Sequence, residues 1–165
     1  MGGILGEDVG VVRYKGYFDL QPMLRMIYSH LKKKNYDFYE KVHKAKIPEL
    51  ELDWMGEKKV TPYYKYVLEI NIHFYDLIEV EIDDGNGGKR KTNHARFAVT
   101  IDGEVKTGYS TDWDEKKSSK METFKKFFET LTKREFMAKH AQTLILEGVE
   151  LRDKLNGYLG LTVSE

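Results

Sequence analysis

Apolar and polar side chains alternate along the chain between Tyr66 and Ile82, YVLEINIHFYDLIEVEI, in the clearest pattern of the sequence. A period of two residues is typical of a β-strand that is buried on one face only. Only Asp76 and Leu77 interrupt the alternation, and a straight strand of this length would outrun the core of so small a chain. The sequence therefore predicts one long strand that bends or bulges at Asp76. Its apolar side is expected to face the core through Tyr66, Leu68, Ile70, Ile72, Phe74, Ile78, Val80 and Ile82.

The N-terminal part of the chain predicts a short strand and then a helix. Apolar residues alternate from Val11 to Phe18, which favours a strand, whereas residues 1–10 are expected to form a flexible arm. Asp19 is a residue type that often caps the N-terminus of a helix. Apolar residues then recur at helical spacing, at Leu20, Met23, Leu24, Ile27 and Leu31. The lysines at 32–34 and Asn35 suit the C-terminal end of this helix.

Three more strands are predicted around the long one. Residues 36–46 and ELELDW at 49–54 each favour a strand, and the short link after the second predicts its antiparallel pairing with the long strand. Asp83 to His94 is rich in turn residues and is expected to form a mobile hairpin loop. The partner strand is then expected to start at Ala95.

Two interpretations of Asp102 and Gly103 are open. The pair has the composition of a two-residue hairpin turn, or the strand continues through it, with a bulge at Gly103. A hairpin would place Ile101 opposite Glu104 and so mix apolar and charged residues on one face. Continuity is therefore the favoured interpretation.

Residues 119–158 predict either two helices or one kinked helix. Ser119 with Glu122, and Thr132 with Glu135, have the spacing of capping boxes, which mark helix starts. The second half carries a stripe of residues three and four apart, at Met137, Ala141, Leu144, Gly148, Leu151, Leu155 and Tyr158.

The order of elements predicts an α+β fold. It has an antiparallel sheet of about four to six strands, whose apolar face is covered by helices that include the long C-terminal ones. Residues 1–165 are expected to form a single domain. The arm occupies 1–10, a strand-helix-sheet body 11–118, and the C-terminal helices 119–158.

Composition excludes several classes of protein. The chain has 165 residues, 41% hydrophobic and 33% charged, and no run of about eighteen apolar residues that would span a membrane. We expect a soluble, cytoplasmic protein without a membrane partner. The absence of cysteine excludes disulfides, thiol catalysis and cysteine-bound metals.

No motif of a known active site is present. The five histidines form no HExxH pattern, and GNGG at 85–88 lies in a predicted hairpin, whereas a nucleotide-binding loop joins a strand to a helix. A metal site beside His73, or an enzyme that uses Glu69, His73 and Asp76, are minor alternatives. We therefore assign no catalytic, cofactor-binding or metal-binding residue, and the sequence favours a protein that is not an enzyme.

Basic residues cluster in five stretches that suit contact with an RNA backbone or another partner, at 32–34, 41–46, 89–91, 116–120 and 133–134. Aromatic residues nearby would stack on bases. Acidic neighbours compensate much of this charge, so a solvated surface is the competing interpretation. The candidate contact residues are Lys89, Arg90, Lys91, Lys116, Lys117 and Lys120.

A curved sheet closed by a long C-terminal helix is similar to the helix-grip architecture of START-type lipid-binding domains. One helix rather than a pair follows the first strand here, so the resemblance concerns architecture alone. It implies an alternative function, a carrier of a small hydrophobic ligand with a pocket between the sheet and the C-terminal helices. The candidate pocket residues are Leu68, Ile70, Ile72, Phe124, Phe128 and Leu131.

The segments KYVLEINIHFYDLIEVEI and ARFAVTIDGEV, with Tyr109 and Trp113, resemble a group of small uncharacterised archaeal α+β proteins with the same order of elements. The resemblance covers about residues 13–155 and implies a fold and an archaeal origin, without site residues. We expect a non-enzymatic binding or assembly module. It is expected to be a homodimer that engages a macromolecular partner, either a protein or the ribosome or another RNA.

Overall fold

The structure is a computed structural model that describes residues 4–62, 64–107 and 119–161, with the backbone alone for 4–8, 107 and 119–137. Its elements are β1 (Ile4–Phe18), α1 (Leu20–Lys33), β2 (Asp37–Lys46), β3 (Glu49–Lys59), β4 (Tyr64–Asp83), β5 (Lys89–Thr107) and α3 (Ser119–Tyr158). The α+β class, the antiparallel sheet and the number of strands predicted from the sequence are confirmed.

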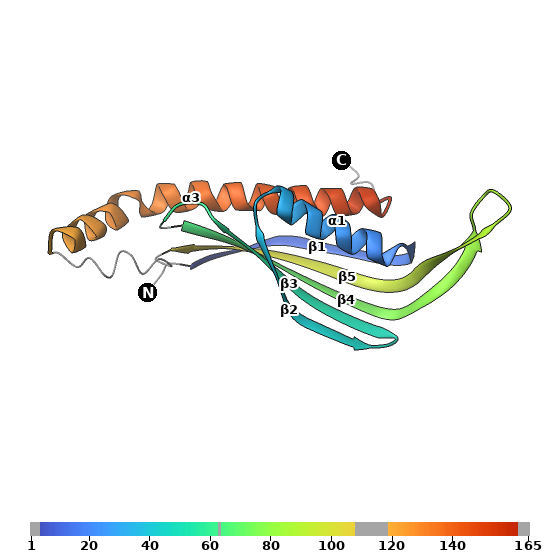
Figure 1. Cartoon of the computed structure of the whole chain (residues 1–165). Helices are drawn as coiled ribbons and strands as arrows, with labels where there is room; N and C mark the ends of the chain where they lie inside the picture. The colour runs from blue at the N-terminus through green and yellow to red at the C-terminus, as the bar shows by residue number, and fades with distance from the viewer. Residues whose placement is uncertain (1–3, 63, 108–118, 162–165) are drawn as a thin grey trace.

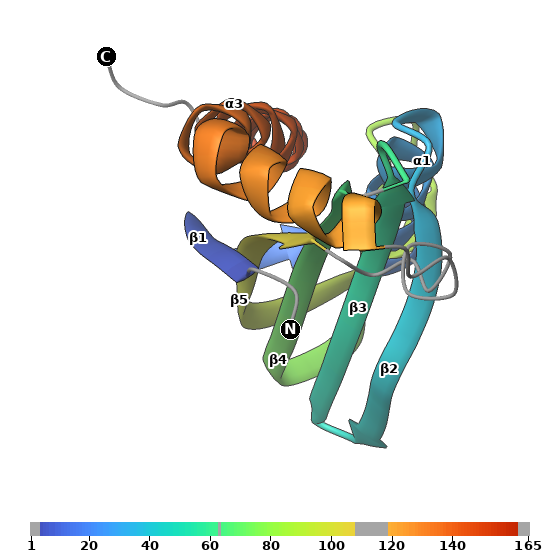
Figure 2. The same cartoon turned by 90° about the vertical axis from the view of Figure 1, so that its left-hand side faces the viewer.

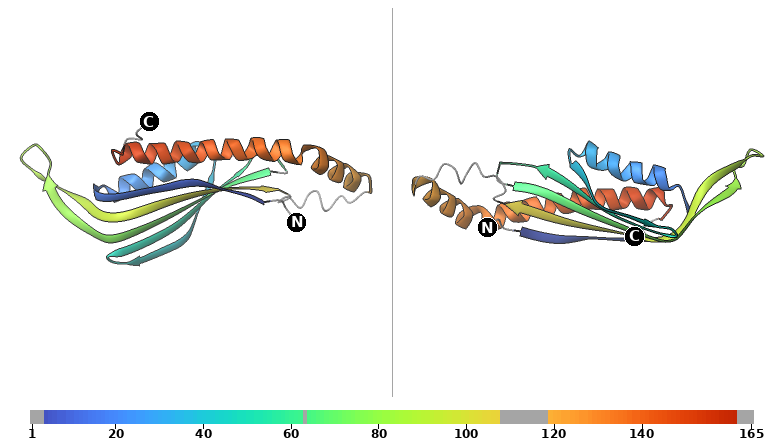
Figure 3. Two further views of the ribbon diagram at one scale, coloured as in Figure 1. Left: turned by 180° about the vertical axis from the view of Figure 1, so that it is seen from behind. Right: turned by 60° about the horizontal axis from the view of Figure 1, so that its bottom comes forward.

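The five strands form one antiparallel sheet in the order β1-β5-β4-β3-β2. Consecutive strands from β2 to β5 pair with one another, and β1 pairs with the last strand, β5. Both helices lie on one face of the curved sheet, with α3 along β1 and β5 and α1 beside α3 (Figure 1, Figure 2). We call this face the inner face and the opposite face the outer face. No helix among the described residues covers the outer face (Figure 3).

The inner face of β4 is the centre of the hydrophobic core. Leu68, Ile70, Ile72 and Phe74 have no exposed surface. These residues have the parity that the sequence predicts for the core, and ELELDW pairs antiparallel with β4 as expected. Burial of a large apolar side chain contributes about 1.5–3 kcal/mol. This face of β4 therefore holds the sheet and the helices together.

A bulge interrupts β4 at the position that the sequence predicts. The register against β5 shifts just before Ile78, and Asp76 has a positive φ of 54°. The extra residue inverts the alternation, so that Leu77 is buried and Ile78 is 51% exposed. The prediction that Ile78, Val80 and Ile82 face the core is therefore wrong, because beyond the bulge this side of the strand belongs to the outer face.

The flexible arm expected at residues 1–10 is wrong for residues 4–10, which form the first part of β1. They pair with the end of β5, beginning with Ile4 opposite Lys106. A β-ladder joins backbone groups, so a segment without apolar alternation can extend a sheet. A register shift between Asp8 and Gly10 accompanies the burial of Val9.

The loop between β4 and β5 is shorter than the predicted span of 83–94. The two strands pair as far as Asp83 and Lys89, which leaves residues 84–88 for the loop. Residues 89–94 escaped prediction as strand because this end of the hairpin curves away beyond the helices, where no apolar face is required (Figure 1).

β5 continues through Gly103, which confirms the favoured interpretation of that position. The register against β4 is regular there, and the shift lies in the facing part of β1. A side chain at Gly103 would meet Leu144 of α3 at 3.1 Å. The glycine therefore allows the helix to approach the sheet closely.

Helix α1 begins and ends where the sequence predicts. Asp19 is its N-cap, but its side chain makes no capping hydrogen bond. Instead the Asp19 carboxylate accepts hydrogen bonds from the Thr92 hydroxyl (2.7 Å) and from Arg90 (3.0 Å). The bond from Thr92 is the main cause that lowers the pKa of Asp19. Asn35 follows the helix with a positive φ of 67°, which suits its predicted place at the C-terminus.

Helix α3 is continuous from Ser119 to Tyr158, and its axis changes direction in its N-terminal part (Figure 3). One bent helix is thus found, in agreement with one of the two predicted arrangements. Within the described side chains, the predicted stripe is buried at Ala141, Leu144, Gly148, Leu151 and Leu155. The Tyr158 hydroxyl donates a hydrogen bond to the Asp19 carbonyl (3.0 Å) and ties the helix end to the start of α1.

Helix α3 approaches β1 closely at Gly148, and this contact supplies the first prediction. A Cβ at Gly148 would lie 2.8 Å from Val9, so Gly148→Ala should lower the free energy of unfolding by about 1–3 kcal/mol through overpacking. The control is Gly157→Ala in the same helix, where a Cβ meets nothing within 4 Å and should be stabilising by up to about 1 kcal/mol. Urea denaturation measures both, and equal effects of the two substitutions would contradict this packing.

Candidate functional site

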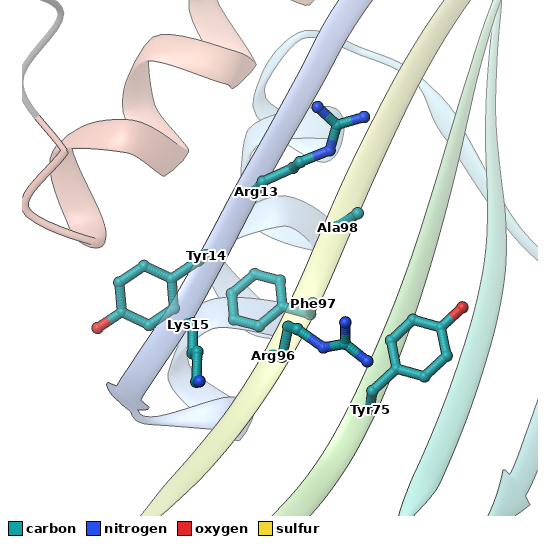
Figure 4. A pocket seen from close by; sticks show the side chains of 7 residues that line it. All are labelled: Arg13, Tyr14, Lys15, Tyr75, Arg96, Phe97 and Ala98. Carbon is teal, nitrogen blue, oxygen red and sulfur yellow. The ribbon is translucent and has the colours of Figure 1, made fainter.

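A hollow of about 430 Å³ lies on the outer face of the sheet, where β1, β5 and β4 run side by side (Figure 4). We call it the outer hollow. The residues that line it are Arg13, Tyr14, Lys15, Tyr75, Arg96, Phe97 and Ala98. The rings of Tyr14 and Phe97 contact each other as part of the hydrophobic core on the inner face. The rim of the hollow is therefore formed by the other side chains. Ala98 leaves space between its larger neighbours.

Three cations surround the outer hollow. Arg96 lies directly opposite Lys15 in the register of β1 with β5, and Arg13 lies opposite Ala98 in the next outward-facing row. The Cβ atoms of directly opposed residues are roughly 4.5–5.5 Å apart, and like charges at that separation repel. The cluster therefore costs stability in the free protein.

No carboxylate among the described side chains forms an ion pair with Arg13, Lys15 or Arg96. Several other basic residues of the sheet form ion pairs, for example Lys41 with Glu69 at 3.5 Å and Lys58 with Glu147 at 2.6 Å. The outer hollow is therefore a local centre of positive charge in a chain whose net charge is zero.

Aromatic contacts orient Arg96. Its guanidinium carbon lies 5.0 Å from the centre of the Tyr75 ring, and Figure 4 shows the side chain extended toward that ring. Tyr75 in turn stacks on His73, with ring centres 4.2 Å apart and planes 9° apart. The His73 Nε2 atom lies 3.5 Å from the Glu49 carboxylate. A stacked guanidinium keeps its N–H donors in one plane, which suits recognition of a phosphate or carboxylate.

The outer hollow can bind an anion, and its residues supply no nucleophile paired with a base. The described part of the chain also holds no cluster of three or more histidine and acidic side chains that would ligate a metal.

The basic residues predicted from the sequence lie elsewhere. Lys89, Arg90 and Lys91 are at the start of β5, and two of them are compensated: Arg90 by Asp19 at 3.0 Å and Lys91 by Glu79 at 3.5 Å. Lys116 and Lys117 lie outside the described residues, and Lys120 is in the part of α3 whose side chains are not described. Their role in binding stays a prediction.

Sequence reasoning missed the cations of the outer hollow because they are scattered singly through two segments. Arg13 and Lys15 alternate with apolar residues in β1, and Arg96 does so in β5. The available signal was their outward parity, but it becomes a cluster only when β1 pairs with β5.

The residues of the predicted hydrophobic pocket fall into two groups, one with described side chains and one without. Leu68, Ile70 and Ile72 have no exposed surface and belong to the core. Phe124, Phe128 and Leu131 lie in α3, outside the described side chains, so the pocket itself stays a prediction.

A second cluster of titratable groups fixes α3 to the inner face. Glu147 of α3 forms an ion pair with Lys58 (2.6 Å) and accepts a hydrogen bond from the Tyr36 hydroxyl. Burial is the main cause that raises the pKa of Tyr36. Seven residues before Glu147 in α3, Nδ1 of His140 lies 2.6 Å from the hydroxyl of Tyr66. Because these groups satisfy one another, the cluster positions the helix.

Comparisons of the chain with protein-family models, with curated proteins and with solved structures find no match. Within the described residues, neither helix combines the length and the apolar character that crossing a bilayer requires. Function is therefore inferred from the geometry of the outer hollow.

Relief of the repulsion in the outer hollow supplies a stability prediction. Lys15→Glu places a carboxylate opposite Arg96 and should raise the free energy of unfolding by about 0.2–1 kcal/mol. The control is Lys44→Glu, which places a like charge opposite Glu51 and should be destabilising. Urea denaturation at low salt distinguishes these opposite signs, and destabilisation by Lys15→Glu would show that the cations do not repel.

Burial of His30 between the helices supplies a pH prediction. Burial is the main cause that lowers the pKa of His30 from its usual 6.5. The unfolded chain then binds a proton more readily than the folded one, so stability is complete above pH 6.5 and falls as the pH drops below it. His30→Leu should weaken this loss of thermal stability, whereas His43→Leu, at an exposed site of β2, should leave it unchanged. The same loss in all three proteins would contradict the assignment.

Proposed function

We propose that the protein is a non-enzymatic RNA-binding module whose outer hollow holds the phosphate backbone. The observation that supports it is the group of Arg13, Lys15 and Arg96 around an apolar floor, without an ion pair to any carboxylate among the described side chains. Phosphate groups would remove the repulsion between these cations, and contacts of Arg and Lys with phosphates supply most of the affinity of nucleic-acid binding.

The shape of the outer hollow favours a polymer over a free small anion. All of its lining residues come from three adjacent strands of one sheet, so it has a floor and a rim without a roof. Small-molecule sites usually enclose about 70–90% of their ligand, which such a surface cannot do. A chain that continues across the sheet gains further contacts beyond the hollow.

An open antiparallel sheet is a known type of surface for RNA. In such domains helices cover one face, and aromatic and basic side chains of the other face contact the nucleotides. The present sheet has this division, with α1 and α3 on the inner face (Figure 2) and with Tyr75 and Arg96 lining the outer hollow (Figure 4). This likeness concerns the type of surface and supports the proposal only together with the charges.

The predicted homodimer finds less support than RNA binding. The edge strand β2 carries lysines at 41, 44 and 46 and a register shift between Glu40 and Val42. Lysines and bulges on an edge oppose its pairing with another strand. Dimer formation through this edge is therefore not part of the proposal.

The proposal predicts salt-dependent RNA binding that depends on the outer hollow. The double variant Lys15→Glu/Arg96→Glu should bind single-stranded RNA much more weakly and flatten the dependence of log Kobs on log salt concentration by about 1.4. Fluorescence anisotropy of a labelled RNA over a salt series measures both quantities.

The control reverses the charge of one arginine and one lysine on the helical side of the molecule. Arg25→Glu/Lys33→Glu alters two exposed residues of α1 and should keep both the affinity and the salt dependence. Lys89→Glu/Lys91→Glu tests the contacts predicted from the sequence and is expected to have a smaller effect, because Lys91 is paired with Glu79. Equal loss in the two matched double variants, or no binding by the wild type, would contradict the proposal.

A further inference from the structure

A row of exposed side chains continues the outer hollow along the sheet. His94 of β5 lies opposite Tyr17 of β1 and opposite Ile78 of β4. The rings of Tyr17 and His94 meet edge to face, with centres 4.9 Å apart. The next outward-facing row is that of Lys15 and Arg96, two residues away, which is roughly 6.6 Å along a strand.

The bulge in β4 adds Ile78 to this row. It inverts the alternation and turns Ile78 outward, where this side chain is 51% exposed. Tyr17 is 59% exposed, so more than half of its surface is open despite the contact with His94. Such exposure of apolar surface beside three cations suits a ligand that carries both a negative charge and flat apolar groups.

We propose that Tyr17, His94 and Ile78 form a base-binding subsite, and that the protein therefore selects single-stranded RNA; this inference rests on the proposed function. The phosphates lie in the outer hollow, and an adjacent base stacks on Tyr17. Every base has a π-face, so such stacking is tolerant of sequence. Bases in a duplex are already stacked on one another. The side chains on a sheet surface therefore contact only the phosphates of a duplex.

The mixture of charge and aromatic surface decides in favour of a nucleic acid over a protein partner. An acidic protein would be attracted by Arg13, Lys15 and Arg96, but it would gain little from a tyrosine set edge to face against a histidine. A nucleotide strand carries a phosphate and a base in every repeat, which matches the change from a basic row to an aromatic row.

The experiment compares three probes by fluorescence anisotropy: a single-stranded RNA of about 12 nucleotides, the same strand annealed to its complement, and a strand of equal length with abasic central positions. The wild type should bind the single strand most tightly. Tyr17→Leu should weaken that binding by about tenfold, leave the salt dependence unchanged and remove the preference over the abasic strand. Tyr17→Phe keeps the ring and should behave as the wild type.

The control is Tyr39→Leu, which removes a tyrosine of similar exposure, 46%, from β2 at the other edge of the sheet. It should keep the full affinity. If the wild type binds all three probes equally, the base-binding subsite is refuted while RNA binding through the outer hollow stands. If no probe binds, the proposed function fails as well. If Tyr17→Leu fails to fold, the comparison of probes on the wild type still tests whether bases contribute to binding, and equal binding of all three probes still refutes the subsite.

Discussion

Burial of the inner face of β4 is the interaction on which the rest of the structure depends. Four side chains of this face are fully removed from water: Leu68, Ile70, Ile72 and Phe74. Without a helix over the inner face they would be exposed to water. The close approach of α3 at Gly148 and Gly103 meets this requirement, and the ion pair of Glu147 with Lys58 fixes where the helix lies. Covering one face in this way leaves the other face open to a ligand.

The outer face of the sheet places residues of like charge next to one another. The guanidinium carbon of Arg96 lies 5.0 Å from the centre of the Tyr75 ring, and the pairing of β1 with β5 keeps the backbone of Arg96 opposite that of Lys15. The repulsion between these residues is stored in the folded state and is relieved when negative charge arrives. A rigid surface also loses little conformational entropy on binding. The same sheet thus gives stability on one face and recognition on the other.

The sequence predicted the parts of the fold that depend on local periodicity. The alternation in β4 revealed both the strand and the bulge at Asp76, but the inversion of facing beyond the bulge needed the register against β5. The strand at residues 4–10 was missed because its pairing uses backbone groups, which leave no side-chain pattern. Arg13 and Arg96 are far apart in the chain, so their meeting depends on topology that no local signal carries.

The pairing of β1 with β5 has a consequence for synthesis. Ile4 is translated before its partner Lys106, which emerges from the ribosome only after the whole β2–β4 meander. Contacts between such distant residues slow folding, and unpaired strands promote aggregation meanwhile. Because α3 follows all five strands in the chain, the nascent chain carries the apolar side of β4 uncovered until α3 has been translated. Co-translational protection by chaperones would matter most during that interval.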